Sequence, residues 1–102
     1  MKLLTKAIKE KAQKQFDDSS DMNQMVVAKF FDAMGSWAWF LMNMDKDEDY
    51  CWGIVKGFEV EMGGFLLSEL KEALGRRLER DILFEPMKAK DVWEQLNKGE
   101  HV

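Results

Sequence analysis

Few residues of this chain have side chains suited to nucleophilic or acid–base chemistry: it has one cysteine, Cys51, and one histidine, His101. A thiol nucleophile needs a base within hydrogen-bonding distance, and that base is most often a histidine. Cys51 lies inside an apolar run and His101 is next to the last residue of the sequence, so the pattern does not pair them. Free cysteines are usually packing residues. We therefore expect Cys51 to be buried and inert, and the protein not to be an enzyme.

An acidic run has the alternate-residue spacing that opens a calcium-binding loop, with Asp45, Asp47 and Asp49. Tyr50 stands where that loop needs glycine, and Lys56 stands where it needs a bidentate glutamate. One histidine and one cysteine also fall short of the ligand cluster that zinc requires. No glycine-rich loop with a Lys-Ser or Lys-Thr pair is present to hold a phosphate. We expect a solvated turn at the acidic run, with no metal and no cofactor.

The stretch before the acidic run is apolar on both faces of a predicted strand, with Trp37, Trp39 and Leu41 on one and Phe40 and Met42 on the other. An antiparallel strand with one solvated face should instead alternate apolar and polar residues. Two interpretations are open. Either helices cover both faces of the sheet, or one face is an adaptable apolar surface that contacts a partner.

If the protein is a binder, large side chains should supply most of the affinity and nearby charges should set orientation and encounter rate. The sequence offers both kinds of residue close together along the chain. The predicted partner-binding residues are Trp37, Trp39, Asp45, Asp47, Glu48 and Asp49. Self-association through the same residues is an alternative to a foreign partner.

The net charge of −4 is spread unevenly along the chain. Residues 1–15 contain five lysines against one glutamate, whereas residues 16–49 contain eight acidic residues against two lysines. A basic patch for nucleic acid is one interpretation, and a solvated helix face is the other. The negative net charge of the whole chain and the lack of a recognisable nucleic-acid-binding motif favour the solvated helix face. The candidate patch comprises Lys2, Lys6, Lys9, Lys14, Arg76, Arg77 and Arg80.

The elements that must position these residues follow from the hydrophobic period. Alternation with a period of two predicts strands, the first of which should place Val26, Ala28 and Phe30 on one face. Turn residues join the first four strands as an antiparallel meander, and Gly63 with Gly64 should end the fourth. The predicted strands cover residues 24–31, 37–42, 50–56, 58–62 and 78–85.

Three helices complete the prediction. Apolar residues recur every four positions in an amphipathic first helix, which has Thr5 as N-cap and is followed by a loop at 17–21. Ser68 can cap a short middle helix that Gly75 ends, and a last helix covers residues 89–98. The apolar positions of the first helix are Leu4, Ile8, Ala12 and Phe16.

The chain therefore has the pattern of one α+β domain over residues 1–102, with an antiparallel sheet of about five strands and three helices. No apolar run approaches the ~20 residues of a membrane-spanning helix, and the opening MKLLTK lacks the apolar stretch of a signal peptide. A lone cysteine cannot form an intramolecular disulfide, which fits a reducing compartment. We expect a cytoplasmic protein without membrane contact.

Four segments carry a family resemblance: MKLLTKAIKEK, VVAKFFDAMGSWAWFLMNMD, YCWGIVKGFEVEMGGFLLSEL and ERDILFEP. Over nearly its whole length the chain resembles a small domain-of-unknown-function family of phage, plasmid and integrative-element proteins, often encoded near antirestriction genes. Typical members of that family carry a Gly-Pro-Leu-Gly-like insertion between the short helix and the last strand. The corresponding segment of this chain, residues 73–77, is shorter. The resemblance implies a mobile-element setting and supplies no catalytic residues.

We accordingly expect a non-enzymatic accessory protein of a mobile element that binds a host protein, as an inhibitor of a bacterial defence system such as a CRISPR effector or a restriction enzyme. The kind of target comes from the resemblance alone, and the lack of catalytic equipment comes from the residues. The alternative is a nucleic-acid-binding accessory factor that uses the basic N-terminal helix. A third possibility is an enzyme whose catalytic carboxylates do not stand out in the sequence.

Overall fold

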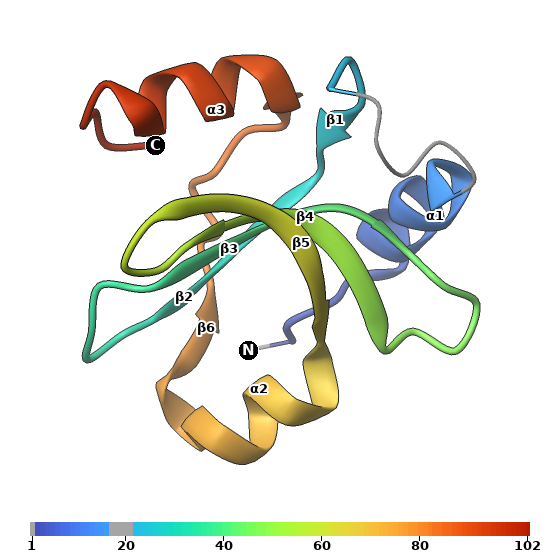
Figure 1. The fold of residues 1–102 in the computed structure, drawn as a ribbon. Helices are drawn as coiled ribbons and strands as arrows, with labels where there is room; N and C mark the ends of the chain where they lie inside the picture. The colour runs from blue at the N-terminus through green and yellow to red at the C-terminus, as the bar shows by residue number, and fades with distance from the viewer. Residues whose placement is uncertain (1, 17–21) are drawn as a thin grey trace.

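The computed structural model describes residues 2–16 and 22–102, so the loop predicted at 17–21 lies outside the described residues. Its centre is a five-stranded antiparallel sheet in the order β5-β4-β3-β2-β6 (Figure 1). The predicted α+β class and the predicted meander are both confirmed. The strands are β2 (Ala28–Asp32), β3 (Ala38–Met44), β4 (Tyr50–Lys56), β5 (Val60–Leu66) and β6 (Leu78–Arg80).

Helices cover both faces of this sheet. The helix α1 (Lys6–Lys14) and the helix α2 (Leu67–Leu74) pack on one face, and α3 (Ala89–Asn97) packs on the other. A 3₁₀ turn, η2 (Gly75–Arg77), follows α2. A second sheet pairs β1 (Met25–Val26) with β7 (Met87–Lys88) beside α3. Within the described ranges, no helix has the length and apolar character needed to cross a lipid bilayer.

The central strand β3 is buried along its whole length, which explains its apolar pattern. Trp39 and Leu41 lie in the cluster under α1 and α2, whereas Phe40 and Met42 lie in the cluster under α3. The opposite placement predicted for these side chains is therefore confirmed. Of the two interpretations of this strand, burial by helices on both faces is the correct one.

The first predicted strand is interrupted, and one of its face assignments is wrong. Val26 belongs to β1 and packs under α3, whereas Ala28 and Phe30 belong to β2 and pack on the opposite face. Between them, Val27 donates its backbone N–H to the Leu41 oxygen at 2.8 Å. The chain shifts here from the small sheet to the large one, and this irregularity reverses the alternation.

The fourth strand runs further than predicted because its two glycines continue it. Gly63 and Gly64 pair with Gly53 and Trp52 of β4. A Cβ built on Gly64 would lie 2.6 Å from the hydroxyl oxygen of Tyr50. Glycine at this position therefore makes room for a neighbouring ring, and the prediction that it ends the strand is wrong.

The fifth predicted strand is shorter than its alternation suggested, because β6 ends at Arg80. The Asp81 carboxylate accepts the backbone N–H of Leu83 at 2.9 Å, and this contact turns the chain away from the sheet. Ile82 and Leu83 are consequently exposed rather than aligned along β2. The last helix was predicted nearly to its observed bounds.

The ends of the other two helices also test the prediction. Thr5 caps α1 as expected, since its Oγ1 accepts the backbone N–H of Ile8 at 3.2 Å. The helix ends at Lys14, where the backbone N–H of Gln15 donates to the Ala12 oxygen at 3.2 Å, and the Gln15 side chain donates to the Met42 oxygen of β3 at 2.6 Å. Gly75 ends α2 with φ of +54°, as predicted.

Candidate functional site

The structure separates the two halves of the predicted partner-binding set. Trp37 and Trp39 lie at the start of β3, and the acidic residues follow its other end, roughly 25 Å away along an extended strand. Trp39 is 6% exposed and belongs to the core. The six predicted residues therefore do not form one continuous surface.

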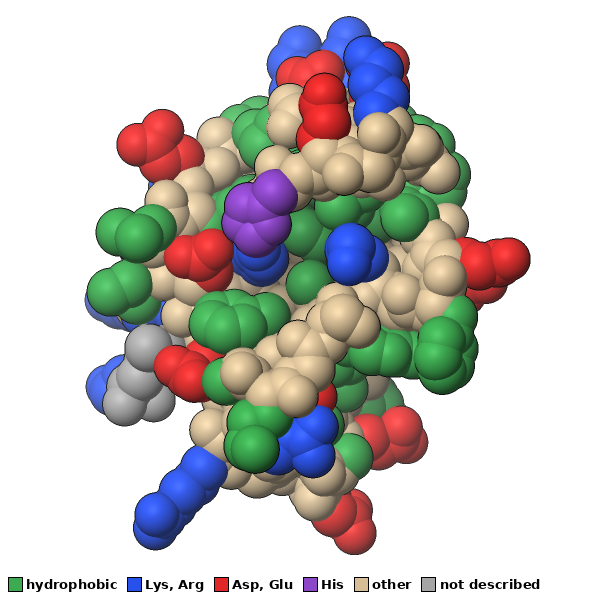
Figure 2. Space-filling view, turned by 90° about the vertical axis from the view of Figure 1, so that its left-hand side faces the viewer, with side chains coloured by type: hydrophobic (Ala, Val, Ile, Leu, Met, Phe, Trp, Pro, Cys, Tyr) green, Lys and Arg blue, Asp and Glu red, His purple; other side chains and the backbone are tan. Residues whose placement is uncertain are grey.

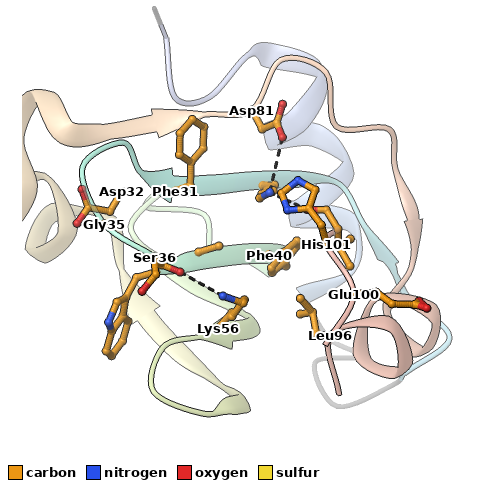
Figure 3. Close-up of a pocket in the computed structure, with 14 residues that line it drawn as sticks. Phe31, Asp32, Gly35, Ser36, Phe40, Lys56, Asp81, Leu96, Glu100 and His101 are labelled. Atoms are coloured by element: carbon orange, nitrogen blue, oxygen red, sulfur yellow. Dashed lines mark hydrogen bonds and ion pairs between the residues drawn. The ribbon is translucent and has the colours of Figure 1, made fainter. Parts of the chain in front are cut away.

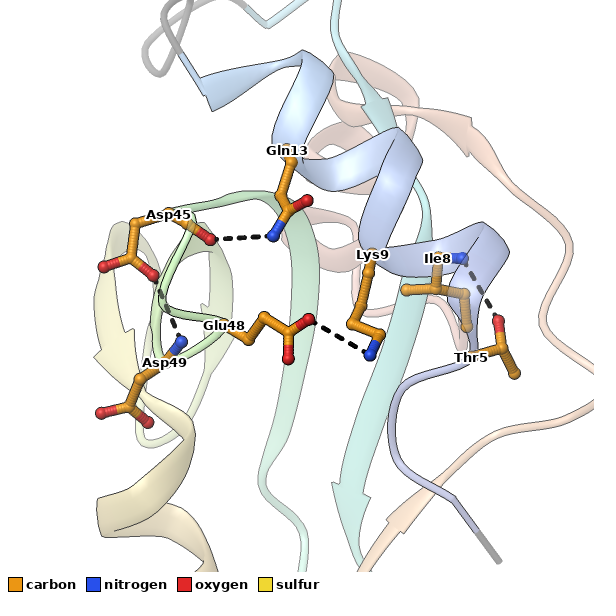
Figure 4. Close-up of polar contacts among 7 residues, drawn as sticks. All are labelled: Thr5, Ile8, Lys9, Gln13, Asp45, Glu48 and Asp49. Atoms are coloured by element: carbon orange, nitrogen blue, oxygen red, sulfur yellow. Dashed lines mark hydrogen bonds and ion pairs between the residues drawn. The ribbon is translucent and has the colours of Figure 1, made fainter.

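The acidic loop is mostly occupied with contacts inside the chain (Figure 4). Glu48 forms an ion pair with Lys9 of α1 at 3.1 Å, and the backbone oxygen of Asp45 accepts a hydrogen bond from Gln13. The Asp45 carboxylate accepts the backbone N–H of Asp49 at 3.2 Å. The prediction that the acidic loop is a solvated turn is confirmed, but its residues also connect the loop to α1.

Asp47 differs from the other acids of this loop. It is exposed, and across residues 2–16 and 22–102 its side chain takes part in no hydrogen bond or ion pair. Among the four acids of the predicted set, Asp47 is the one with no structural contact to lose on meeting a partner.

The opposite end of the sheet exposes apolar side chains that the sequence interpretation missed. Phe58 is 95% exposed in the β4–β5 turn, and Met34 is 79% exposed in the β2–β3 turn. Both turns lie at the same end of the sheet (Figure 1). Trp37 is half-buried between them, with its ring centroid 5.4 Å from that of Phe58 in an edge-to-face arrangement. We call Met34, Trp37 and Phe58 the turn-end surface.

Trp37 is held rigidly within this surface. Its ring lies 6.0 Å from that of Trp39, which is itself fixed in the core. A Cβ on Gly57 would come within 2.5 Å of the Trp37 ring, so the ring lies directly over the glycine backbone. The signal in the sequence that could have found this surface is Gly57 immediately before Phe58, which places a large apolar residue in a tight turn.

A cavity of about 370 Å³ opens beside the turn-end surface, on the α3 side of the sheet. Figure 2 shows this side, with the purple His101 at the edge of a hollow that contains blue side chains and has green apolar groups around it. We call it the lysine pocket, because Lys29 and Lys56 both line it. Phe40 contributes to its wall.

Lys29 is an unusual residue for such a position, because its side chain is only 8% exposed. Its Nζ donates to the backbone oxygen of Val102 at 2.6 Å, lies 3.7 Å from the Asp81 carboxylate and sits 5.7 Å from the centre of the Phe40 ring. Burial lowers the pKa of Lys29 from its ordinary value, although Asp81 opposes this shift.

A second, more open groove of about 740 Å³ lies between the N-terminal segment and α2. Lys2, Lys9, Lys71 and Arg76 line it, together with two glutamates. The structure thus brings part of the predicted basic patch into one place, and we call this the basic groove. Arg77 of the same predicted patch is instead bound to Asp32, at 2.6 Å.

Cys51 and His101 lie on opposite faces of the sheet. The thiol is fully buried in the cluster under α1 and α2, as predicted, and burial raises its pKa to about 12. His101 lines the lysine pocket on the other face. In the part of the chain that the structure describes, no group of three or more His, Cys, Asp or Glu residues could hold a metal ion.

The described residues thus form an α+β protein with an exposed apolar surface, a small pocket lined by two lysines and a basic groove. The family model for a protein family of unknown function, DUF2958, matches residues 2–100, so the chain belongs to this family. The predicted membership of a domain-of-unknown-function family is thereby confirmed, and the mobile-element setting stays an expectation. Searches of curated proteins and of solved structures found no match.

Proposed function

We propose that this protein is a non-enzymatic binding protein that contacts a partner protein through the turn-end surface. The observation that carries the proposal is the 95% exposure of Phe58, next to a half-buried Trp37 and at the same end of the sheet as the exposed Met34. Large apolar side chains grouped at one end of a domain are typical of protein contact sites. Single exposed apolar side chains scattered over a surface are common and do not indicate such a site.

The rigidity of Trp37 supports this role. An anchor that is already fixed before binding loses little conformational entropy when it meets a partner. Trp39 and Gly57 fix the Trp37 ring from below, and Phe58 contacts it at the edge. Of the residues predicted from the sequence, Trp37 therefore serves as the anchor and Trp39 as its support.

For the identity of the partner we propose a host protein, with this chain acting as a mobile-element inhibitor of a bacterial defence system. This finer part depends on the sequence resemblance described above. Inhibition by binding needs no catalytic group, and a rigid surface such as the turn-end surface lowers its entropic cost.

The test is affinity capture of the tagged protein from a bacterial lysate, with and without nuclease. We expect a stoichiometric, nuclease-resistant partner that Phe58→Ser loses and Ile82→Ser keeps, because Ile82 is an exposed apolar residue of a different turn. Matching urea unfolding curves would show that both variants fold. Capture that is equal in all three proteins, or that nuclease abolishes, would contradict the proposal.

The basic groove favours a second candidate, a nucleic-acid-binding accessory factor. Lys2, Lys71 and Arg76 line the groove, and among the described residues none of the three forms an ion pair. Three phosphate contacts to a single strand would give a slope of about −2 in log affinity against log salt. Fluorescence anisotropy of a labelled single-stranded oligonucleotide measures this slope. Lys71→Gln with Arg76→Gln should abolish binding, whereas Lys90→Gln on α3 should leave it unchanged.

A further inference from the structure

We propose that the lysine pocket binds a small organic anion, with a carboxylate or phosphate group beside Lys29 and Lys56 and a flat apolar body against the half-buried side chain of Phe31. This site adjoins the turn-end surface, since Trp37 lines the pocket as well, but the proposal does not depend on the proposed partner.

The strand register places both lysines on the same face of the sheet. Lys29 of β2 pairs with Phe40 of β3, and Lys56 of β4 pairs with Ala38 of β3. Ala38 and Phe40 are two positions apart and both pack under α3. Because directly paired residues in an antiparallel sheet share a face, the two lysines flank β3 on the α3 side. Figure 3 shows Lys56 and Phe40 at the same cavity.

The charges around the two ammonium groups leave room for an anion. Burial and the like charge of Lys56 both act against the charged form of Lys29, whose Nζ contacts the Val102 oxygen at 2.6 Å and the Asp81 carboxylate at 3.7 Å. Lys56 donates to the backbone oxygen of Ser36, a neutral group, at 3.3 Å. Among the described residues Lys56 forms no ion pair, so an anion beside the two lysines would supply an acidic partner for it, and such charge-assisted contacts are strong in a partly buried site.

The other acidic residues that line the pocket, Asp32 and Glu100, do not serve as acidic partners of Lys56. Asp32 is bound by two hydrogen bonds to Arg77, at 3.0 and 2.6 Å. Glu100 is exposed, and Figure 3 shows it pointing away from Lys56. Neither carboxylate is therefore in contact with the ammonium group of Lys56.

The size and the walls of the pocket define the rest of the ligand. A volume of about 370 Å³ lies in the range of pockets that hold small molecules. Its apolar lining comprises Phe31 and Trp37, which are half-buried, and Phe40 and Leu96, which are buried. A ligand with one anionic group and a body about the size of an aromatic ring matches both the lysines and the apolar residues that line the pocket.

The test is an NMR titration of the ¹⁵N-labelled protein with benzoate and with phenyl phosphate, using benzamide as the neutral analogue. We expect saturable shifts of residues around Phe40 with at least one of the two anions, and which anion binds more tightly identifies the charged group. Benzamide should give no saturable shift. Shifts that fail to saturate with both anions, or that are equal with benzamide, would overturn the proposal.

Substitutions give an independent check. Lys56→Gln should weaken binding of the tighter anion about tenfold or more, because it removes one charged contact. Lys46→Gln changes the same net charge in the acidic loop at the other end of the sheet and should leave the affinity unchanged. Lys56 is half-buried at the end of β4, so its substitution avoids the folding risk of changing Lys29. An unchanged affinity of Lys56→Gln would overturn the proposal.

Discussion

The carboxylate of Asp49 accepts hydrogen bonds from both donors of Ser68, the backbone N–H at 2.7 Å and the hydroxyl at 2.8 Å. The backbone oxygen of Asp49 also accepts the N–H of Leu67 at 3.0 Å. The start of α2 is therefore capped by the acidic loop, since Leu66 at the N-cap position has no side chain that can accept. The prediction that Ser68 is the cap is wrong because a distant carboxylate takes that role.

Removing this cap should destabilise the protein. We expect Asp49→Ala to lower the free energy of unfolding by about 1–2 kcal/mol, the usual cost of losing an N-cap. Asp47→Ala removes the same charge from the same loop but breaks no contact, so it should change stability little. Urea unfolding of the three proteins measures both effects, and equal losses in the two variants would contradict the capping role.

Two glycines of paired strands should respond in opposite ways to substitution by alanine. A Cβ on Gly53 would lie 1.8 Å from the backbone oxygen of Phe40, whereas a Cβ on Gly63 would meet nothing within 4 Å. We expect Gly53→Ala to cost about 3 kcal/mol or more through displacement of the β3 backbone, and Gly63→Ala to be neutral or slightly stabilising. Thermal unfolding compares them directly. A stable Gly53→Ala protein would show that β3 and β4 do not approach this closely.

The ion pair of Asp32 and Arg77 should make stability depend on acid pH. Hydrogen bonds from Arg77, and one from the backbone of Met34, hold the pKa of Asp32 below its ordinary value of 3.8. The unfolded chain therefore takes up this proton at higher pH than the folded one. The stabilising effect is present above 3.8 and is lost as the pH falls through the lower folded-state pKa.

The measurement is urea unfolding of the wild type and Asp32→Asn from neutral pH to about pH 2. The wild type should lose more stability than the variant over the acid part of this range, because the variant has no carboxyl group to protonate. Parallel curves for the two proteins would mean that the contact with Arg77 does not hold in solution.

Cys51 should resist alkylation in the folded protein. Its pKa of about 12, against an ordinary value of 9.0, reduces the reactive thiolate about a thousandfold near neutral pH, and burial blocks access as well. Iodoacetamide followed by mass spectrometry should show slow modification of the native protein and rapid modification in urea. Rapid labelling without urea would show that the sheet opens near Cys51.

The raised pKa of Cys51 also affects stability in alkali. Below 9.0 the thiol is protonated in both states, so its contribution to stability is fully present. As the pH rises from 9.0 toward about 12, the unfolded chain ionises first and this contribution is lost. Cys51→Ala should therefore lose less stability than the wild type over this interval. The same loss in both proteins would contradict the assignment.

The sequence by itself determined the α+β class, the order of the elements and the two faces of β3. These features depend on local periodicity, and Trp39 and Phe40 had to point to opposite sides once the stretch was extended. Local chemistry also placed the Thr5 cap and the Gly75 helix end, because both act within one turn of the helix.

Only the tertiary structure decided which charged and apolar side chains meet. Trp37 and Asp45 are near each other in the sequence, but an extended strand carries them to opposite ends of the sheet. Lys29 and Lys56 are far apart in the sequence, and strand pairing on either side of β3 brings them to one pocket. Side-chain spacing along a strand follows from the sequence, whereas neighbours across strands depend on register and turns, which are settled by the packing of the whole chain.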